Sequence, residues 1–196
     1  MEKQDHQLPI TKGSYTNYPK PKNTNLYYAI FLEILILYGI VTNYQQLYEH
    51  NEYLAGVCLG SFSTLFSQSI SQLYRQSFSF DKHLKFFLWG CINSLVSNFW
   101  IGILLHSVDD NIHRFLLDQT VGVLTGQLIF VFFNGFWESS FNFASLKSTY
   151  LTCLRYSYMI WPLVSFLSFF HLHEDYIFPL NCLVTLIWNI ILAMIS

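Results

Sequence analysis

The run HLHED at residues 171–175 is the densest group of side chains that could bind a metal. Its members His171, His173, Glu174 and Asp175 are ligand types for a divalent cation. They lie, however, on a tight connection between two apolar segments, and alternating histidines without a distant fourth ligand rarely complete a zinc site. We therefore interpret the run as a polar loop and expect no metal and no other cofactor.

The cysteines do not form the pattern of a zinc site or of a disulfide framework. Each lies in an apolar stretch without CxxC spacing, which is typical of a small buried hydrophobic residue: Cys58, Cys91, Cys153 and Cys182. The sequence also lacks GxxxxGKS/T, GxSxG and HExxH, the motifs of phosphate-binding loops, serine hydrolases and zinc peptidases. These patterns predict a protein that is not an enzyme.

Glu33 is an ionisable residue inside a long apolar segment. A bare charge at the centre of a bilayer costs at least about 2.5 kcal/mol, so Glu33 should face protein, water or a cation. It could belong to a proton or ion route, contact another subunit, or be a protonated or hydrogen-bonded structural residue. We favour the structural interpretation, because the sequence suggests no second buried acid or base beside it.

A second polar group lies near the start of the fourth apolar segment. Arg114 and Asp118 are one helical turn apart and could form an ion pair, while Gln119 could form a hydrogen bond to another helix. The nearest further acids, Asp109 and Asp110, belong to a loop. We therefore expect this group to hold helices together rather than to catalyse a reaction.

Long apolar segments must position these residues, because the composition is not that of a water-soluble domain. Of 196 residues, 53% are hydrophobic and only 11% are charged, whereas about a quarter are charged in typical soluble domains. Six segments approach the roughly 20 residues that cross a hydrocarbon core. They are residues 26–44, 53–73, 84–106, 115–136, 156–170 and 176–195.

Such segments must be helical, because unpaired backbone groups are costly in lipid and the runs are too continuous for barrel strands. We predict an all-α fold, a polytopic transmembrane helix bundle with about four to six membrane helices. One domain over residues 26–196 follows a polar extension over residues 1–25. The fifth segment is short, and residues 139–154 before it have the mixed character of an interfacial amphipathic helix.

The distribution of basic residues predicts that both ends of the chain lie on one side of the membrane. If all six segments cross, the side that holds the N-terminus receives every Lys and Arg except Arg114, and basic residues collect on the side from which a membrane protein is inserted. These residues are Lys3, Lys12, Lys20, Lys22, Arg75, Lys82, Lys85, Lys147 and Arg155.

Small residues recur in the second and third segments, where Gly56 and Gly60 have GxxxG spacing. Such residues let two helix backbones approach closely. We expect these positions to pack helices within one chain rather than to form a dimer.

From residue 82 onward, several residues occur in an order and spacing shared with a known family. They are Lys82, Lys85, Gly90, Trp100, Asp118, Gln119, Trp161, Pro162, Phe169, Trp188, Asn189 and Leu192. The Trp-Pro and Trp-Asn pairs stand at the family's spacing without a gap. In these residues the sequence resembles the multi-span organelle membrane proteins that include the 22-kilodalton peroxisomal membrane protein and its mitochondrial relative Mpv-seventeen.

The sequence departs from the family pattern at polar and helix-breaking positions. Ser94-Leu95 occupies the usual Gly-Pro, Leu124 a proline, Ser165 a glutamine, Ser168 an asparagine, His173 a proline and Ile177 an arginine. If the polar residues of the family line a solute path, the departures predict that part of this lining is lost here.

The resemblance implies a small-solute channel or permeability regulator of the mitochondrial inner or peroxisomal membrane. Because the polar lining looks depleted, we instead predict a structural accessory subunit of a mitochondrial inner-membrane complex, with the channel as the alternative. The expected partners are the lipid bilayer and other membrane subunits. Nucleic acid is not an expected partner, because the net charge is −2 and the basic residues are scattered.

Overall fold

The computed structural model describes residues 24–139 and 141–195, except for the side chains of residues 174, 175, 178, 179 and 193–195. All regular secondary structure in this part is helical, which confirms the predicted all-α fold. The elements are α1 (Thr24–Thr42), α2 (Tyr44–His50), α3 (Glu52–Tyr74), α4 (Phe80–Ser107), α5 (Asn111–Leu117), the π-helical turn η1 (Asp118–Gly122), α6 (Val123–Trp137), α7 (Phe143–Phe170) and α8 (Glu174–Ile195). The extension predicted over residues 1–25 lies outside the described residues, apart from its last two.

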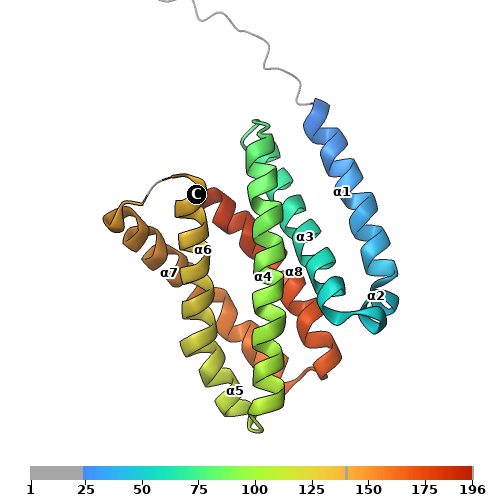
Figure 1. Cartoon of the computed structure of the whole chain (residues 1–196), viewed down its shortest axis with the longest axis vertical. Coiled ribbons are helices and arrows are strands. Elements are labelled where there is room, and N and C mark those ends of the chain that lie inside the picture. Colours follow the sequence, from blue (N-terminus) through green and yellow to red (C-terminus); the bar gives the residue numbers. More distant parts are fainter. Residues whose placement is uncertain (1–23, 140, 196) are drawn as a thin grey trace, which may run out of the picture.

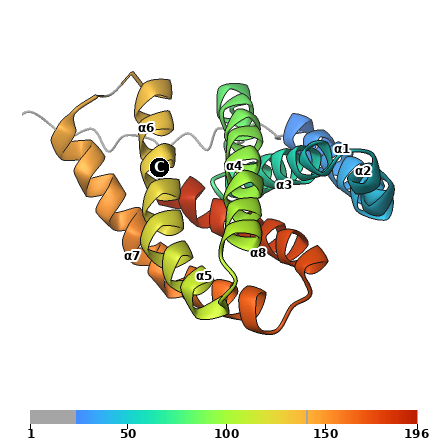
Figure 2. The same cartoon turned by 60° about the horizontal axis from the view of Figure 1, so that its bottom comes forward.

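The long helices run alternately up and down in the bundle (Figure 1). The start of α1, the α3–α4 turn, the end of α6 and the end of α8 lie at the same end of the bundle, as six crossings would require. We call this end the first end, and the end that holds the α4–α5 connection the second end. After a turn of the view, α1 and α2 lie at one flank and α7 at the other (Figure 2).

Polar side chains fix where several helices begin. The Asn51 side chain accepts a hydrogen bond from the backbone N–H of Leu54 at 2.9 Å before α3, and the Asp110 carboxylate accepts one from His113 at 3.1 Å before α5. The Asn142 side chain accepts one from the Ala144 N–H at 3.0 Å before α7. Each bond satisfies a donor that the first helical turn leaves unpaired.

Three helical stretches of the described chain are long and apolar enough to cross a bilayer: Thr24–Thr42, Phe80–Ser107 and Asn111–Trp137. The last is the continuous unit of α5, η1 and α6, and α8 contains a shorter apolar stretch, Leu180–Leu192. Helices α3 and α7 are more polar. Helix α3 packs against α1, α2, α4 and α8, and its serine, threonine and glutamine side chains are buried there rather than facing lipid.

The mixed stretch at residues 139–154 does not form a helix of its own, because from Phe143 onward it belongs to the continuous helix α7. Its interfacial position stays a prediction. The mixed segment forms its first half and the fifth apolar segment its second half. Pro162 lies inside this helix, where the ring removes one backbone hydrogen bond and favours a kink.

Small residues form the contact between α3 and α4. A Cβ atom added to Gly90 would lie 2.6 Å from Cα of Ser61, and one added to Gly60 would lie 1.8 Å from Oγ of Ser94. Larger side chains at these positions would force the two backbones apart. The predicted packing within one chain is therefore confirmed at Gly60 and Gly90.

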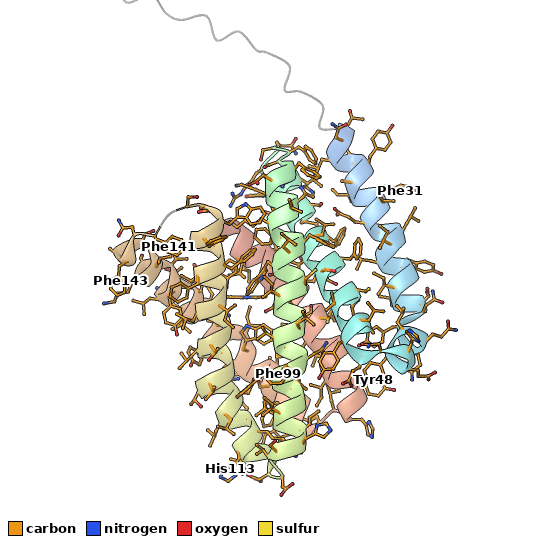
Figure 3. All side chains as sticks on the ribbon, in the orientation of Figure 1. Phe31, Tyr48, Phe99, His113, Phe141 and Phe143 are labelled. Atoms are coloured by element: carbon orange, nitrogen blue, oxygen red, sulfur yellow. The ribbon has the colours of Figure 1, made fainter. Side chains whose placement is uncertain are left out.

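The outer surface carries many large apolar side chains, as a surface solvated by acyl chains requires. In Figure 3, Phe31, Phe141 and Phe143 extend from the periphery of the bundle. Their exposed fractions are 63%, 60% and 81%. Among the described side chains of α1, only Leu26 and Glu33 are buried.

Candidate polar cavity

A cavity of about 110 Å³ lies between α4, the α5–η1–α6 unit, α7 and α8, with Gly60 of α3 also contributing. We call it the central cavity. Its wall combines aromatic and polar side chains. The lining includes Trp89, Asn93, Ser94, Ser97, Trp100, Asp118, Gly126, Gln127, Trp161, Ser165, Ser168, Phe169, Asn181, Thr185 and Trp188.

Each helix contributes one face to this cavity. On α4 the lining positions Trp89, Asn93, Ser97 and Trp100 recur every three or four residues, which is the spacing of one side of an α-helix. On α7 Trp161, Ser165 and Ser168 follow the same rule. The polar residues are thus turned inward while the opposite faces carry the apolar surface.

Asp118 is the acidic residue of this lining. Its Oδ1 accepts a hydrogen bond from Nε1 of Trp100 at 2.9 Å, and its Oδ2 accepts one from the Ser165 hydroxyl. The Gln119 amide also donates to Oδ2 at 3.4 Å. The carboxylate therefore joins α4 to α7 and accepts hydrogen bonds from three donors.

Gln119 strengthens the same junction. Its Nε2 donates to Oγ of Ser165 at 2.8 Å, which confirms the predicted hydrogen bond to another helix. The predicted Arg114–Asp118 ion pair is absent from the described ion pairs. Arg114 donates to the carbonyl oxygens of Val108 and Leu105 at 2.7 and 3.0 Å, because the end of α4 leaves these acceptors without helical partners.

A π-helical turn places Asp118 at the cavity. The backbone N–H of Val123 donates to the Asp118 carbonyl, five residues earlier, and such turns are frequent at functional sites. The Tyr158 hydroxyl of α7 donates to the Gln119 carbonyl at 2.8 Å. A Cβ atom on Gly122 would lie 2.5 Å from Nε1 of Trp100, so glycine is required beside this contact.

Several residues of the lining carry buried polar atoms that have no partner among the described residues. They are Oε1 of Gln127, Nε1 of Trp161 and Oγ of Ser168. Buried polar groups normally make hydrogen bonds to protein or to water. A polar cavity of this volume has room for several water molecules, so the wall can solvate a polar solute.

A second cavity of about 310 Å³, which we call the vestibule, lies toward the second end of the bundle. Its lining includes Asn111, Arg114, Leu172, His173 and Ile177. Ser168 and Phe169 line both cavities. The vestibule and the central cavity are therefore neighbours, separated at these two residues of α7.

Glu33 lies away from both cavities, in a buried cluster between α1, α3 and α4. The Ser69 hydroxyl donates to Oε1 of Glu33 at 2.8 Å and lies 2.8 Å from Nε2 of His83. Nε2 of Gln72 lies 3.0 Å from the other ring nitrogen of His83, Nδ1. The expectation that no buried base accompanies Glu33 is therefore wrong, since His83 is itself buried.

The two lysines near the first end, Lys82 and Lys85, differ from each other in burial and in contacts. Lys85 is buried, and its Nζ donates to Oε1 of Glu138 at 2.7 Å, at the end of α6. Lys82 is exposed in the first turn of α4. Asp81, beside it, accepts a hydrogen bond from Nε1 of Trp137 at 3.1 Å.

The HLHED run connects α7 to α8. Among the described residues, no three His, Cys, Asp or Glu side chains lie close enough to hold a metal ion. The side chains of Glu174 and Asp175 lie outside the described part, so the prediction for the whole run is not tested. Of its histidines, His173 lines the vestibule.

A family model of membrane proteins matches the last part of the described chain, over α7 and most of α8. Residues 139–193 match the Mpv17 / PMP22 family. The resemblance expected from the sequence is confirmed in this segment. The comparisons with curated proteins and with solved structures gave no match. Over this segment the chain is similar to the Mpv17 / PMP22 family, and its long apolar helices indicate a membrane protein.

The family-motif residues within the matched segment lie in the interior. Trp161, Phe169 and Trp188 line the central cavity, and Asn189 donates to Oγ1 of Thr64 on α3 at 2.9 Å. Pro162 is the proline inside α7. These positions therefore shape the cavity and join α8 to α3.

The motif residues before the matched segment also occupy structural positions. Trp100 and Asp118 line the central cavity and are hydrogen-bonded, Gln119 bonds to α7, and Gly90 lets α3 approach α4. Lys85 forms the ion pair with Glu138.

Three of the departures from the family pattern keep a polar side chain in the lining of the central cavity. Ser94, Ser165 and Ser168 line the central cavity at positions where the Mpv17 / PMP22 resemblance implies Gly, Gln and Asn. At the last two positions a smaller polar side chain replaces a larger one, which leaves more space while a hydroxyl takes the place of an amide. The expected loss of polar lining therefore does not apply at these three positions, whereas Ile177 puts an apolar side chain in the vestibule where the resemblance implies an arginine.

Sequence reasoning missed the lining residues Asn93, Ser97, Gln127 and Thr185. Polar residues four apart in an apolar helix, such as Asn93 and Ser97, were the available signal.

Proposed function

We propose that this Mpv17 / PMP22-type protein is non-enzymatic and lets a small polar solute pass through an organelle membrane. The observation that supports the proposal is the adjacency of the vestibule and the central cavity, which share Ser168 and Phe169. Together these cavities extend from the second end into the middle of the bundle. Movement of these two side chains would join them.

The polar wall gives this path its chemistry. Hydroxyl and amide groups replace the hydration of a solute, while the exposed apolar surface of the same helices remains in contact with lipid. On α4 and α7, one face of the helix lines the cavities and the opposite face contacts lipid. The proposal therefore needs no additional subunit to enclose the solute.

The test is solute flux through liposomes that contain the purified protein, with glycerol as a neutral probe. Gly126→Leu adds volume at a residue of the central cavity, and Gly102→Leu is the matched control. An added Cβ atom meets no described atom within 4 Å at either position, and only Gly126 lines the central cavity. We expect Gly126→Leu to slow glycerol flux several-fold and Gly102→Leu to leave it unchanged. Absence of flux, or equal flux in both variants, would contradict the proposal.

We further propose the mitochondrial inner membrane as the location, with the peroxisomal membrane as the alternative. The family match supports an organelle membrane. Immunogold labelling or fractionation of the tagged full chain distinguishes the two membranes.

The structural accessory role in a mitochondrial inner-membrane complex stays a prediction. The outer face of α1, with Phe31, Leu35 and Tyr38 exposed, fits acyl chains as well as another subunit. Native electrophoresis after mild solubilisation tests this role. Co-migration with a respiratory or ATP-synthase complex would support it, and a free monomer or small homo-oligomer with solute flux would exclude it.

A further inference from the structure

We propose that the central cavity binds a small monovalent cation at Asp118, either an organic ammonium ion or an alkali ion. This inference rests on the proposed function and names the class of solute that the cavity accepts. It is argued from the charge of the wall, the unused acceptor positions, the aromatic lining and the volume.

The ionisable residues of the wall favour a cation over an anion. Asp118 is an acid, and no Lys, Arg or His is among the residues that line the central cavity in the described part of the chain. Its Oδ2 accepts from Ser165 and Gln119, whereas in the described part of the chain Oδ1 accepts only from Trp100. A carboxylate has about four acceptor positions. One position on Oδ1 therefore remains for contact with a cation.

Neutral oxygen atoms elsewhere in the wall add to its polar character. Gln127 is 7% exposed, and its Oε1 has no partner among the described residues. Ser168 is 2% exposed and its hydroxyl is likewise unpartnered. Side-chain oxygens of this kind are suitable for a monovalent cation. A divalent ion is disfavoured, because calcium and magnesium sites in proteins normally use more than one carboxylate or retain several waters.

The aromatic wall favours an ammonium group. Trp89, Trp100, Trp161 and Trp188 line the cavity, and tryptophan attracts cations more strongly than other aromatic residues. The volume of about 110 Å³ is somewhat below that of an engineered cavity of about 150 Å³ that binds benzene. A ligand of about four to six non-hydrogen atoms, such as tetramethylammonium, therefore matches the space.

Arg114 lines the vestibule, so its charge must be considered. Its guanidinium group donates to carbonyl oxygens at the end of α4 and to Oδ1 of Asn111 at 3.2 Å. The end of a helix carries partial negative charge, which offsets this positive charge. The repulsion that a cation meets in the vestibule is thereby reduced.

The test is a binding titration of the full chain in detergent, followed by tryptophan fluorescence and calorimetry. The probes are tetramethylammonium, potassium ion, and tert-butanol as a neutral molecule of similar size. The variants are Asp118→Asn, which keeps the shape of the side chain, and Asp109→Asn, an acid in the exposed loop, as the matched control. We expect cation binding to weaken at least about tenfold in Asp118→Asn and to be unchanged in Asp109→Asn.

Gly126→Leu is the second variant, because Asp118 also holds α4 to α7 and its replacement could impair folding. It fills the cavity without changing the carboxylate, and it should weaken tetramethylammonium binding. Tighter binding of tetramethylammonium than potassium identifies an organic ammonium site, and the reverse order identifies an alkali-ion site. No cation binding, equal binding of tert-butanol, or unchanged binding in both Asp118→Asn and Gly126→Leu overturns the proposal.

The flux assay separates this proposal from the proposed function. Glycerol flux that is sensitive to Gly126→Leu, without cation binding, would preserve solute passage and overturn the cation site. Cation binding that depends on Asp118, without flux of any probe, would preserve the site and overturn solute passage.

Discussion

Oε1 of Glu33 lies 3.9 Å from Nε2 of His83, and the Ser69 hydroxyl bridges the two side chains. This relationship explains how an acid is tolerated inside an otherwise apolar helix. The acid is directed at the polar face of α3, while neighbouring residues of α1 face outward. Because the Ser69 hydroxyl donates its hydrogen bond to Glu33, it can only accept from His83, and the ring nitrogen Nε2 of His83 is therefore the donor in that second hydrogen bond.

Glu33→Leu should destabilise the attachment of α1 to the bundle. The substitution leaves the buried Ser69 hydroxyl without its acceptor, which costs about 1–3 kcal/mol. Glu33→Gln keeps an acceptor and should have a smaller effect. Thermal unfolding in detergent measures the difference, and Phe31→Leu at the exposed face of the same helix is the control. Equal stability of Glu33→Leu and Phe31→Leu would show that the cluster does not hold α1.

Gly90→Ala should destabilise the bundle, because the new Cβ atom would lie 2.6 Å from the backbone of Ser61. We expect a loss of about 1–3 kcal/mol from overpacking. Gly102→Ala lies in the same helix, and its Cβ atom meets no described atom within 4 Å. It should be neutral or stabilising, since alanine favours a helix over glycine by up to about 1 kcal/mol. Unfolding curves measure the stability of the two variants. A Gly90→Ala variant more stable than Gly102→Ala would refute the close α3–α4 contact.

The Lys85–Glu138 ion pair should respond unequally to the removal of its two members. The Lys85 side chain is 5% exposed and that of Glu138 is 47% exposed. Glu138→Ala leaves a buried ammonium group without its partner, whereas Lys85→Met leaves a carboxylate that water can solvate. We expect Glu138→Ala to lower the melting temperature more than Lys85→Met does. The opposite result would contradict this assignment of burial.

The start of α5 should lose stability in acid. Asp110 accepts hydrogen bonds from the backbone and the side chain of His113, which lower the pKa of the carboxyl below its ordinary value. A lowered pKa in the folded state stabilises the protein above the unfolded-state pKa, and this contribution is lost as the pH falls through the folded value. Asp110→Asn keeps a capping oxygen without the charge. The stability difference between the protein and this variant should shrink below about pH 4, and Asp109→Asn is the control.

The apolar patterns predicted the helices better than their ends. Hydropathy placed the third segment at residue 84, because Asp81, Lys82 and His83 interrupt the apolar run. Helix α4 nevertheless begins at Phe80, capped by Ser79. This boundary excluded His83 from the membrane segment, and so its contact with the Glu33 cluster was missed.

The candidate site was predictable where the residue types constrain the geometry. Gln119 was expected to bond to another helix, since an amide in an apolar segment needs a partner, and it bonds to Ser165. The Asp118–Trp100 bond was not predictable, because it depends on the π-helical turn at Asp118–Gly122. A π-helical turn differs from an α-helix only in that its backbone hydrogen bonds span one more residue, and no residue type in the sequence marks this difference.

Fusion of the two predicted elements into α7 shows a similar limit. Ser148, Tyr150, Thr152 and Arg155 make the first half of the helix polar, and hydropathy separated this half from the apolar half. Helical hydrogen bonding continues through both halves, because local polarity does not interrupt a backbone ladder.

The polar character of α3 has a consequence for the biosynthesis of the protein. The Ser67 hydroxyl donates to the Leu186 carbonyl at 2.8 Å, and Thr64 accepts a hydrogen bond from Asn189. Both partners belong to α8, which the ribosome makes more than a hundred residues later. Until α8 has been synthesised, these hydroxyls lack their contacts with α8 and keep only their hydrogen bonds to the Gly60 and Ser63 carbonyls of α3 itself. The C-terminal helix therefore stabilises α3 in the lipid. Loss of α8 should therefore expose a polar surface in the membrane and mark the nascent chain for quality-control degradation.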